Sequence, residues 1–128
     1  MSFIYYNPNP KGKSVGDCVV RGLSKLLNQD WLDTYIDLCI HGAFAGDMPS
    51  ANSVWSAYLA SLGYNKYYLP NSCPNCYTVQ DFCADNPHGK YLLSVGDHVV
   101  AVENGSYYDA WDSGMETLIC FYTKETLD

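Results

Sequence analysis

Basic residues are scarce in this sequence of 128 residues. Seven Lys or Arg stand against fourteen Asp or Glu, which gives a formal net charge of -7 at pH 7, and charged residues of both signs make up only 16%. The few basic residues form no cluster, whereas proteins that bind nucleic acids or anionic membranes need a basic patch to displace counterions or meet lipid headgroups. We therefore expect neither a nucleic-acid partner nor a membrane partner.

Long apolar runs are missing as well. No segment approaches the roughly 20 apolar residues that cross a bilayer, and the first residues lack the basic stretch and apolar core of a secretory signal. The sequence therefore predicts a cytoplasmic protein. Because that compartment is reducing, six cysteines are expected to be free thiols and not a disulfide framework: Cys18, Cys39, Cys73, Cys76, Cys83 and Cys120.

The sequence is rich in apolar and aromatic residues. Hydrophobic residues make up 48% of it, and there are 12 tyrosines. A chain of this length and composition can bury a substantial core, and it contains no repeat, linker or low-complexity segment. We predict a single domain that spans residues 1–128.

The first half of the chain is predicted to be helical after an irregular start. Prolines and glycines disfavour regular structure in residues 1–16. A helix is expected to begin after Gly16 or Asp17, with Cys18 in its first turn. One face of this helix is apolar: Val19, Val20, Leu23, Leu26 and Leu27. The opposite face is polar: Arg21, Ser24, Lys25 and Asn28.

Further helices are predicted in the middle of the chain. One begins at Asp30 and ends before Gly42, with these residues buried: Trp31, Tyr35, Ile36 and Leu38. A third follows Pro49 and has apolar residues at helical spacing: Ala51, Val54, Trp55, Tyr58, Leu59 and Leu62. A short strand over residues 64–69 and a short helix with a Thr78–Asp81 capping box are expected next.

The second half of the chain has the pattern of β-strands. After Gly89 the hydrophobic period changes to two, and strands are predicted over residues 90–95, 98–103, 106–111 and 117–123. Asn104-Gly105 is a strong signal for a two-residue hairpin turn. Helices followed by an antiparallel meander indicate an α+β fold.

Cys18 is the best-placed candidate nucleophile. A thiol ordinarily titrates near ~8.5, and the positive end of a helix lowers this pKa because it stabilises the thiolate. The free N–H groups of the same helix end can also form part of an oxyanion hole. The neighbouring Asp17 opposes a low pKa unless its carboxylate caps the helix.

His98 is the candidate general base, because a position at the start of a strand fixes the direction of its imidazole. The hairpin partner carries two aspartates that could accept the second ring N–H. With a two-residue turn, Asp109 shares the face of His98. A one-residue bulge in the turn would bring Asp112 to that face instead. The residues alone leave both acids open.

Two segments resemble papain-like cysteine peptidases. Asp17-Cys18 at the start of an apolar helix is similar to the Asp-Cys start of the catalytic helix in the NlpC/P60 branch. His98, a strand, a turn, a strand and Asp112 with a small residue after it are similar to the order in Ulp1-like proteases. The resemblance implies a papain-like fold, with N-terminal helices packed on a C-terminal antiparallel meander. It also favours Asp112 over Asp109 as the acid.

The whole chain resembles a group of small proteins encoded by phages and prophages of Gram-positive bacteria. The segments that carry this resemblance are residues 7–10, 16–21, 47–52 and 107–113. It implies a phage protein that acts in the cytoplasm of the host cell. Many papain-like enzymes also place a Gln about six residues before the nucleophile, where this sequence has Gly12. Asn9 and Ser14 are the candidates to replace it in the oxyanion hole, as are backbone N–H groups.

A CxxC motif is the main competing site. Cys73 and Cys76, together with Cys83 and His88, have the ligand types that hold zinc. A single CxxC is a weak signal, and a helix between the second and third cysteine would have to bring the ligands together. Two free thiols in a loop is therefore the preferred interpretation.

These features predict a cysteine peptidase or amidohydrolase that needs no cofactor. Cys18 would attack an amide, isopeptide or thioester of a peptide or protein substrate, with His98 as base and then acid, and water would hydrolyse the acyl-enzyme. An amine in place of water would give a transglutaminase-type transfer. The alternative is a papain-like fold of little or no activity that binds and inhibits a host factor. The reactivity of Cys18 discriminates between these hypotheses.

Overall fold

The structure is a computed structural model that describes residues 2–70 and 72–126 of the chain. Helices dominate the first half and strands the second, so the predicted α+β class is confirmed. The elements are, in chain order, β1 (Ser2–Tyr5), α1 (Cys18–Leu27), α2 (Trp31–Ala45), α3 (Asn52–Ser61), β2 (Asn65–Tyr68), α4 (Val79–Asp85), β3 (Lys90–Ser94), β4 (Val99–Glu103), β5 (Ser106–Asp109) and β6 (Cys120–Thr123).

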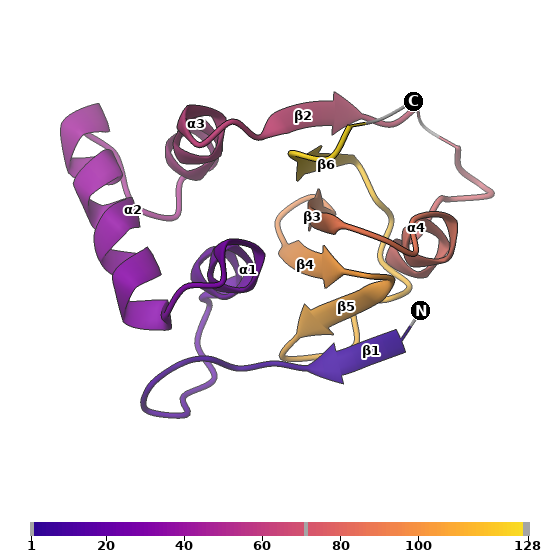
Figure 1. The fold of residues 1–128 in the computed structure, drawn as a ribbon, viewed down its shortest axis with the longest axis horizontal. Coiled ribbons are helices and arrows are strands. Elements are labelled where there is room, and N and C mark those ends of the chain that lie inside the picture. Colours follow the sequence, from indigo (N-terminus) through magenta and orange to yellow (C-terminus); the bar gives the residue numbers. More distant parts are fainter. Residues whose placement is uncertain (1, 71, 127–128) are drawn as a thin grey trace.

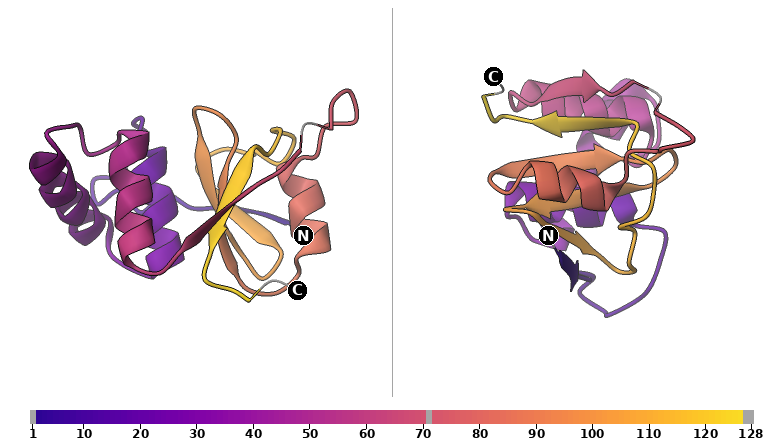
Figure 2. Two further views of the ribbon diagram at one scale, coloured as in Figure 1. Left: turned by 90° about the horizontal axis from the view of Figure 1, so that it is seen from above. Right: turned by 90° about the vertical axis from the view of Figure 1, so that its right-hand side faces the viewer.

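The strands form one sheet, in the order β1-β5-β4-β3-β6-β2, and helices cover both of its faces. Helices α1 and α3 lie on one face with α2 outside them, and α4 lies on the other (Figures 1 and 2). The first face has a core around Leu23, Leu59 and Leu92. The second has a core around Phe82 and Leu93. Successive residues of β3 thus enter opposite cores, as the period of a strand requires.

The connection of the strands differs from the predicted antiparallel meander. Strands β3, β4 and β5 are antiparallel neighbours, but β6 returns to pair with β3, and β2 pairs with β6. At the other edge β1 lies parallel to β5. The sheet is therefore mixed, and the prediction that residues 1–16 are irregular is wrong for β1. The four residues of β1 are mostly exposed, so they show no alternation of apolar and polar residues. The strand is stabilised by its pairing with β5, which the local sequence does not reveal.

The β4–β5 hairpin has the turn that the sequence predicts. Asn104 and Gly105 have φ values of 51° and 78°, and Glu103 pairs with Ser106. Positive φ at both central residues is the geometry of a two-residue type I′ turn. There is no extra residue in this turn, so the strand register is the one that brings Asp109 to the face of His98.

Helix α1 begins where predicted and buries its predicted apolar face, with Leu27 only partly buried, but two residues of its polar face are also buried. Ser24 is 1% exposed and Arg21 is 5% exposed. The hydroxyl of Ser24 hydrogen-bonds to that of Thr34 on α2, at 2.9 Å. Arg21 is ion-paired on both sides, as described below. Helix α1 is thus covered by the sheet on one side and by α2 on the other, which its own periodicity does not reveal.

Helix α2 runs longer than predicted and buries a different face. It continues through Gly42 to Ala45. Leu38 is fully buried as expected, whereas Tyr35 and Ile36 are 42% and 46% exposed. A Cβ on Gly42 would lie 2.7 Å from the carbonyl oxygen of Asp47, so the glycine permits a close return of the chain and does not end the helix.

The predictions for the other two helices are confirmed in part. Helix α3 buries Val54, Trp55 and Leu59, but Ala51 and Leu62 lie outside its bounds, and Leu62 is 37% exposed. At α4, the Thr78 hydroxyl accepts from the Asp81 N–H while the Asp81 carboxylate accepts from the Thr78 N–H, which is the predicted capping box. Among the described residues, no helix combines the length and the apolar character that a membrane span requires.

Candidate active site

Cys18 is the first residue of α1, and Asp17 is the N-cap residue. The side chain of Asp17 makes no capping hydrogen bond to the helix. The N–H groups of the first turn therefore have no side-chain acceptor from the cap residue, and they point toward the N-terminal end where Cys18 lies. This is the arrangement that stabilises a thiolate or an oxyanion.

His98 was the predicted first residue of a strand and lies directly before β4, which begins one residue later at Val99, and its ring lies beside both other members of a triad. Its Nε2 is 2.7 Å from Oδ2 of Asp109. Its imidazole also lies beside Cys18: the two side chains line the same groove, and their interaction lowers the pKa of Cys18 and raises that of His98. Because Nε2 is engaged by Asp109, Nδ1 is the ring nitrogen that serves Cys18. The predicted pair of Cys18 and His98 therefore lies together in the structure.

Asp109 is completely buried at the end of β5, and both of its oxygens have partners. Oδ2 accepts from His98 and from the hydroxyl of Ser113, at 2.7 and 2.6 Å. Oδ1 accepts from the backbone N–H of Ala110 at 2.8 Å and lies 3.0 Å from the guanidinium of Arg21. A buried carboxylate with four such partners is held in its charged form and in one orientation.

Asp112, which the family resemblance favoured, is not the partner of His98. Its Oδ1 instead accepts from the backbone N–H of Gly114 at 3.1 Å and from the hydroxyl of Tyr107. The two-residue hairpin turn explains the difference, because β5 ends at Asp109 before the chain leaves the sheet. The preference for Asp112 is therefore corrected to Asp109, the acid that the simple hairpin register favours.

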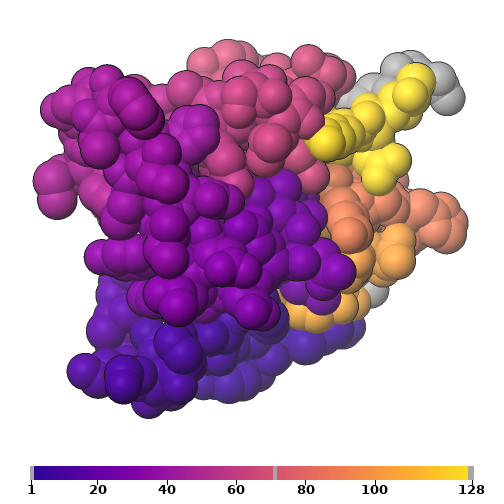
Figure 3. Space-filling view, turned by 60° about the vertical axis from the view of Figure 1, so that its left-hand side comes forward, coloured from indigo at the N-terminus to yellow at the C-terminus, as the bar shows by residue number. Residues whose placement is uncertain are grey.

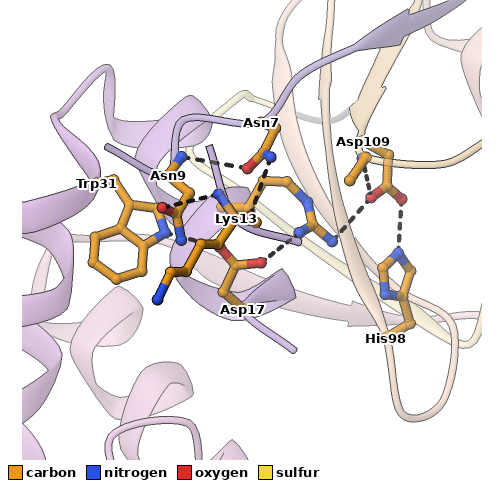
Figure 4. A network of polar contacts seen from close by, with 9 residues as sticks. Asn7, Asn9, Lys13, Asp17, Trp31, His98 and Asp109 are labelled. Carbon is orange, nitrogen blue, oxygen red and sulfur yellow. Dashed lines mark hydrogen bonds and ion pairs between the residues drawn. The ribbon is translucent and has the colours of Figure 1, made fainter. Parts of the chain in front are cut away.

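A chain of polar contacts continues from Asp109 away from the imidazole (Figure 4). Arg21 pairs with Asp109 through one nitrogen and with Oδ1 of Asp17 through the other, at 2.7 Å. Oδ2 of Asp17 accepts from the indole N–H of Trp31 at 2.9 Å. The ion pair with Arg21 offsets part of the charge of Asp17, which reduces the expected conflict with a thiolate at Cys18.

Sequence reasoning missed the contacts that Arg21, Trp31 and Ser113 make in this network. The spacing of Asp17 and Arg21 is the i, i+4 spacing of a helical ion pair, and this was an available signal. No local signal indicates that Asp109, far along the chain, shares the same guanidinium. That contact depends on how α1 packs against the sheet.

The ionisation of the site favours a thiolate–imidazolium pair. Burial alone would raise the pKa of Cys18, but the hydrogen bonds from His98 and the backbone of Val99 outweigh it, and the pKa lies below its ordinary value. The positive charge of Arg21 acts in the same direction. Burial would lower the pKa of His98, yet its contacts with Asp109 and Cys18 raise it to about 9. Burial would raise the pKa of Asp109, but its hydrogen bonds with His98 and Ser113 outweigh burial, and the pKa lies below its ordinary value.

A groove of about 410 Å³ opens onto Cys18 and His98. The segment 14–18 forms one wall, and Asp97, Ala110 and Trp111 lie opposite. The indole of Trp111 packs on the imidazole of His98 with ring centroids 4.8 Å apart, and Trp111 is 46% exposed. The nucleophile is therefore reachable from solvent while the base is shielded on one side.

Only one of the two predicted oxyanion candidates reaches the groove. Ser14 is part of its wall. Asn9 is not, and its side-chain oxygen accepts from the backbone N–H groups of Lys11 and Lys13, at 2.9 and 3.4 Å. Asn9 therefore stabilises its own turn, as Asn does by bonding the backbone two residues on. Ser14 and the N–H groups of α1 remain the candidates.

The zinc interpretation is wrong for the CxxC motif. Cys73 and Cys76 are joined by a disulfide, so their sulfurs are not free to bind a metal, and the expectation of six free thiols is corrected for these two. Cys83 lies on α4 and is buried in the core on that face of the sheet. Within residues 2–70 and 72–126, no group of three or more Cys, His, Asp or Glu side chains forms a metal site.

No family model, no curated protein and no solved structure matches the chain. The arrangement of the site is therefore the basis on which its chemistry is inferred. A thiol at a helix start, an imidazole bonded to it and a buried carboxylate behind the imidazole are the three groups of nucleophilic thiol catalysis.

Proposed function

We propose that this chain is a thiol hydrolase that acts through a covalent acyl-thioester on Cys18. The observation that carries the proposal is the continuous set of contacts from Cys18 through His98 to the buried Asp109. Each residue then has one role. Cys18 is the nucleophile, His98 is the acid and base, and Asp109 orients His98 and stabilises its charge.

The reaction has two steps with one proton carrier. The Cys18 thiolate attacks the carbonyl carbon, and the carbonyl electron pair moves onto oxygen. Collapse of this tetrahedral intermediate breaks the bond to the leaving group, which takes the proton of His98. Water then attacks the thioester while His98 accepts its proton. The acid is released, Cys18 leaves as a thiolate and His98 is again protonated.

Two features support stabilisation of the oxyanion. The N–H groups of the first turn of α1 have no capping side chain, and the helix dipole is positive at this end. Ser14 adds a hydroxyl donor on the same groove wall. A Gln before the nucleophile is thus not required for the chemistry that we propose.

We further propose that the chain is a papain-like protein encoded by a phage or prophage and acting on peptides or proteins in the host cytoplasm. The order Cys, His, Asp supports the first part, as does a cysteine at the start of a helix that packs on a sheet carrying the base. The resemblance of the whole chain to small phage proteins supports the second. An open groove beside an exposed tryptophan suits an extended chain.

The reactivity of Cys18 tests this proposal. We expect iodoacetamide to alkylate Cys18 with a pH midpoint below the ordinary ~8.5 of a thiol. Cys39, which is half-buried and outside the site, is the control within the same molecule. Peptide mapping by mass spectrometry would report both rates, and His98→Gln should bring the Cys18 rate down to that of an ordinary thiol.

Turnover needs a second measurement. With p-nitrophenyl acetate, wild-type protein should release p-nitrophenol in a burst and carry an acetyl group on Cys18 that then hydrolyses. Cys18→Ser should show neither adduct nor burst. A Cys18 that labels no faster than Cys39 would refute the hydrolase. An acetyl adduct that forms but persists for hours would favour the alternative of an inactive binding protein.

A further inference from the structure

Helix α2 carries a line of exposed apolar side chains that the proposed catalytic site does not use. Leu32, Ile36, Ile40 and Phe44 recur at every fourth position and are 55%, 46%, 50% and 91% exposed. Residues four apart lie on one face of a helix, so these four form a ridge roughly 18 Å long. We call them the α2 ridge. Single exposed apolar residues are ordinary, but a contiguous row of them marks a contact surface.

The α2 ridge lies on the outside of the molecule. Helix α2 packs against α1 and α3 through its opposite side, where Thr34, Leu38 and Gly42 are buried. In Figures 1 and 2 it is the outermost helix, beyond α1 and α3 as seen from the sheet, and Figure 3 is turned to bring this side forward. The groove at Cys18 lies instead between α1 and the sheet. The ridge is thus a separate surface.

The Asp, Glu, Lys and Arg residues of α2 and the segments that flank it in sequence are all acidic, although the loop with Lys11 and Lys13 approaches the N-terminal end of α2, where Pro10 and Leu32 line one pocket. Residues 26–65 contain four aspartates and neither Lys nor Arg. Asp30, Asp33 and Asp47 are exposed at the two ends of α2. Asp37 is half-buried and accepts from the hydroxyl of Tyr58 at 2.9 Å. An apolar ridge between acidic ends is therefore the surface that α2 offers.

This charge pattern indicates which kind of partner would bind the α2 ridge. A second copy in antiparallel contact would bring Asp47 of one chain toward Asp30 and Asp33 of the other, and an anionic membrane would be repelled as well. A partner whose apolar face is bordered by Lys or Arg is complementary to the α2 ridge in both hydrophobicity and charge. A ridge with a four-residue spacing also fits the groove between ridges of another helix.

We propose that the α2 ridge docks an amphipathic helix of a protein partner whose apolar face is bordered by basic residues. Four side chains offer much less than the roughly 800 Å² per partner of a standard stable interface, so a single such helix should bind with a Kd in the micromolar range.

A pair of synthetic helical peptides tests both parts of the proposal. They share one leucine stripe and differ only in its borders, which are lysine in one and glutamate in the other. At an ionic strength of about 0.15 M, fluorescence anisotropy should show at least tenfold tighter binding of the lysine peptide. Ile40→Ser with Phe44→Ser should weaken this binding at least tenfold, and Asp33→Asn should weaken it by a smaller factor.

Matched controls separate docking from general attraction to an acidic protein. Met115→Ser with Ile119→Ser removes two exposed apolar side chains outside α2 and should leave the binding unchanged. Equal effects of the two double variants, or equal binding of the two peptides, would overturn the proposal. So would self-association in sedimentation equilibrium that the Ile40 and Phe44 changes abolish. These changes should not alter the alkylation rate of Cys18, so failure here is distinct from failure of the hydrolase.

Discussion

Asp109 is held by four polar contacts although its side chain is excluded from solvent. One oxygen contacts the side chains of His98 and Ser113, and the other contacts Arg21 and the backbone N–H of Ala110. Rotation of the carboxylate would break all of them together. The imidazole is therefore oriented by a group that is itself fixed, which is what efficient proton transfer requires.

Exchange of the two candidate acids for amides should have very different effects. Asp109→Asn leaves a similar shape but removes the charge that stabilises imidazolium, so we expect turnover to fall roughly 10²- to 10⁴-fold. Asp112→Asn changes contacts only with Tyr107 and Gly114 and should stay within about threefold of wild type. Steady-state hydrolysis of an activated ester would check both. Equal losses in the two variants would contradict the assignment of Asp109.

The ionisation of His98 predicts how turnover depends on pH. The pKa of His98 is raised to about 9, so the imidazole carries the proton for the leaving group at neutral pH and loses it as the pH rises through about 9. Hydrolysis of an amide, whose leaving amine needs this proton, should therefore fall over that range. Alkylation of Cys18 needs only the thiolate and should not fall. On the acid side both rates should fall as Cys18 becomes protonated, below its ordinary pKa.

Measurement of both rates on the same protein from about pH 5 to 10 would check this prediction. An alkylation rate that fell together with hydrolysis at high pH would contradict the assignment of the fall to the proton of His98, because alkylation needs no proton donor. Amide hydrolysis that continued to rise above pH 9 would contradict the role of His98 as the acid.

Helix α1 is the element that joins the two halves of the site. It supplies Cys18 at its start and Arg21 one turn later, and Arg21 is ion-paired to the end of β5. The base enters from β4, which is the strand that α1 packs against most extensively. A contact between Arg21 and Asp109 therefore restrains the helix that carries the nucleophile relative to the sheet that carries the base.

Two basic residues on α1 provide a matched comparison. Arg21→Met leaves Asp17 and the buried Asp109 without their cation, so we expect a loss of about 3–5 kcal/mol in the free energy of unfolding and a rise in the pKa of Cys18. Lys25→Met removes a partly exposed pair with Glu103, which should cost at most about 1 kcal/mol.

Urea unfolding and the alkylation midpoint of Cys18 would check this prediction. Arg21→Lys is the second variant, because it keeps a charge but loses the planar group that spans two carboxylates. Its Cys18 pKa should lie between those of wild type and Arg21→Met. If both Arg21 variants left stability and the midpoint unchanged, the guanidinium would not be what joins helix and sheet.

For the whole molecule, the Cys73–Cys76 disulfide is the feature that depends on redox conditions. It closes a loop of only four residues, and in the chain-entropy account so short a loop contributes about 2 kcal/mol or less. We therefore expect reduction to leave the fold and the reactivity of Cys18 intact. Thermal melting of the oxidised and the reduced protein would check the fold. Alkylation of Cys18, after the reductant has been removed, would check its reactivity. Loss of structure on reduction would contradict it.

The sequence by itself determined the elements and the ingredients of the site. Local patterns suffice for a helix that begins at Cys18, for the capping box at Thr78 and for the Asn104–Gly105 turn, because each depends on neighbours a few residues away. The same turn favours Asp109 if its register is followed without adjustment. Resemblance to other proteins pointed to Asp112, and there the local argument was the better guide.

Only the tertiary structure decided which charges are shared and which faces are covered. Arg21 pairs with an aspartate 88 positions further on, and burial of both residues depends on the packing of α1 between the sheet and α2. Likewise β1 exists because β5 offers it backbone partners, and Ile36 is exposed because nothing lies outside α2 in the described chain. Contacts between distant segments carry no periodic signal in the sequence, and they set the environment that makes Cys18 reactive.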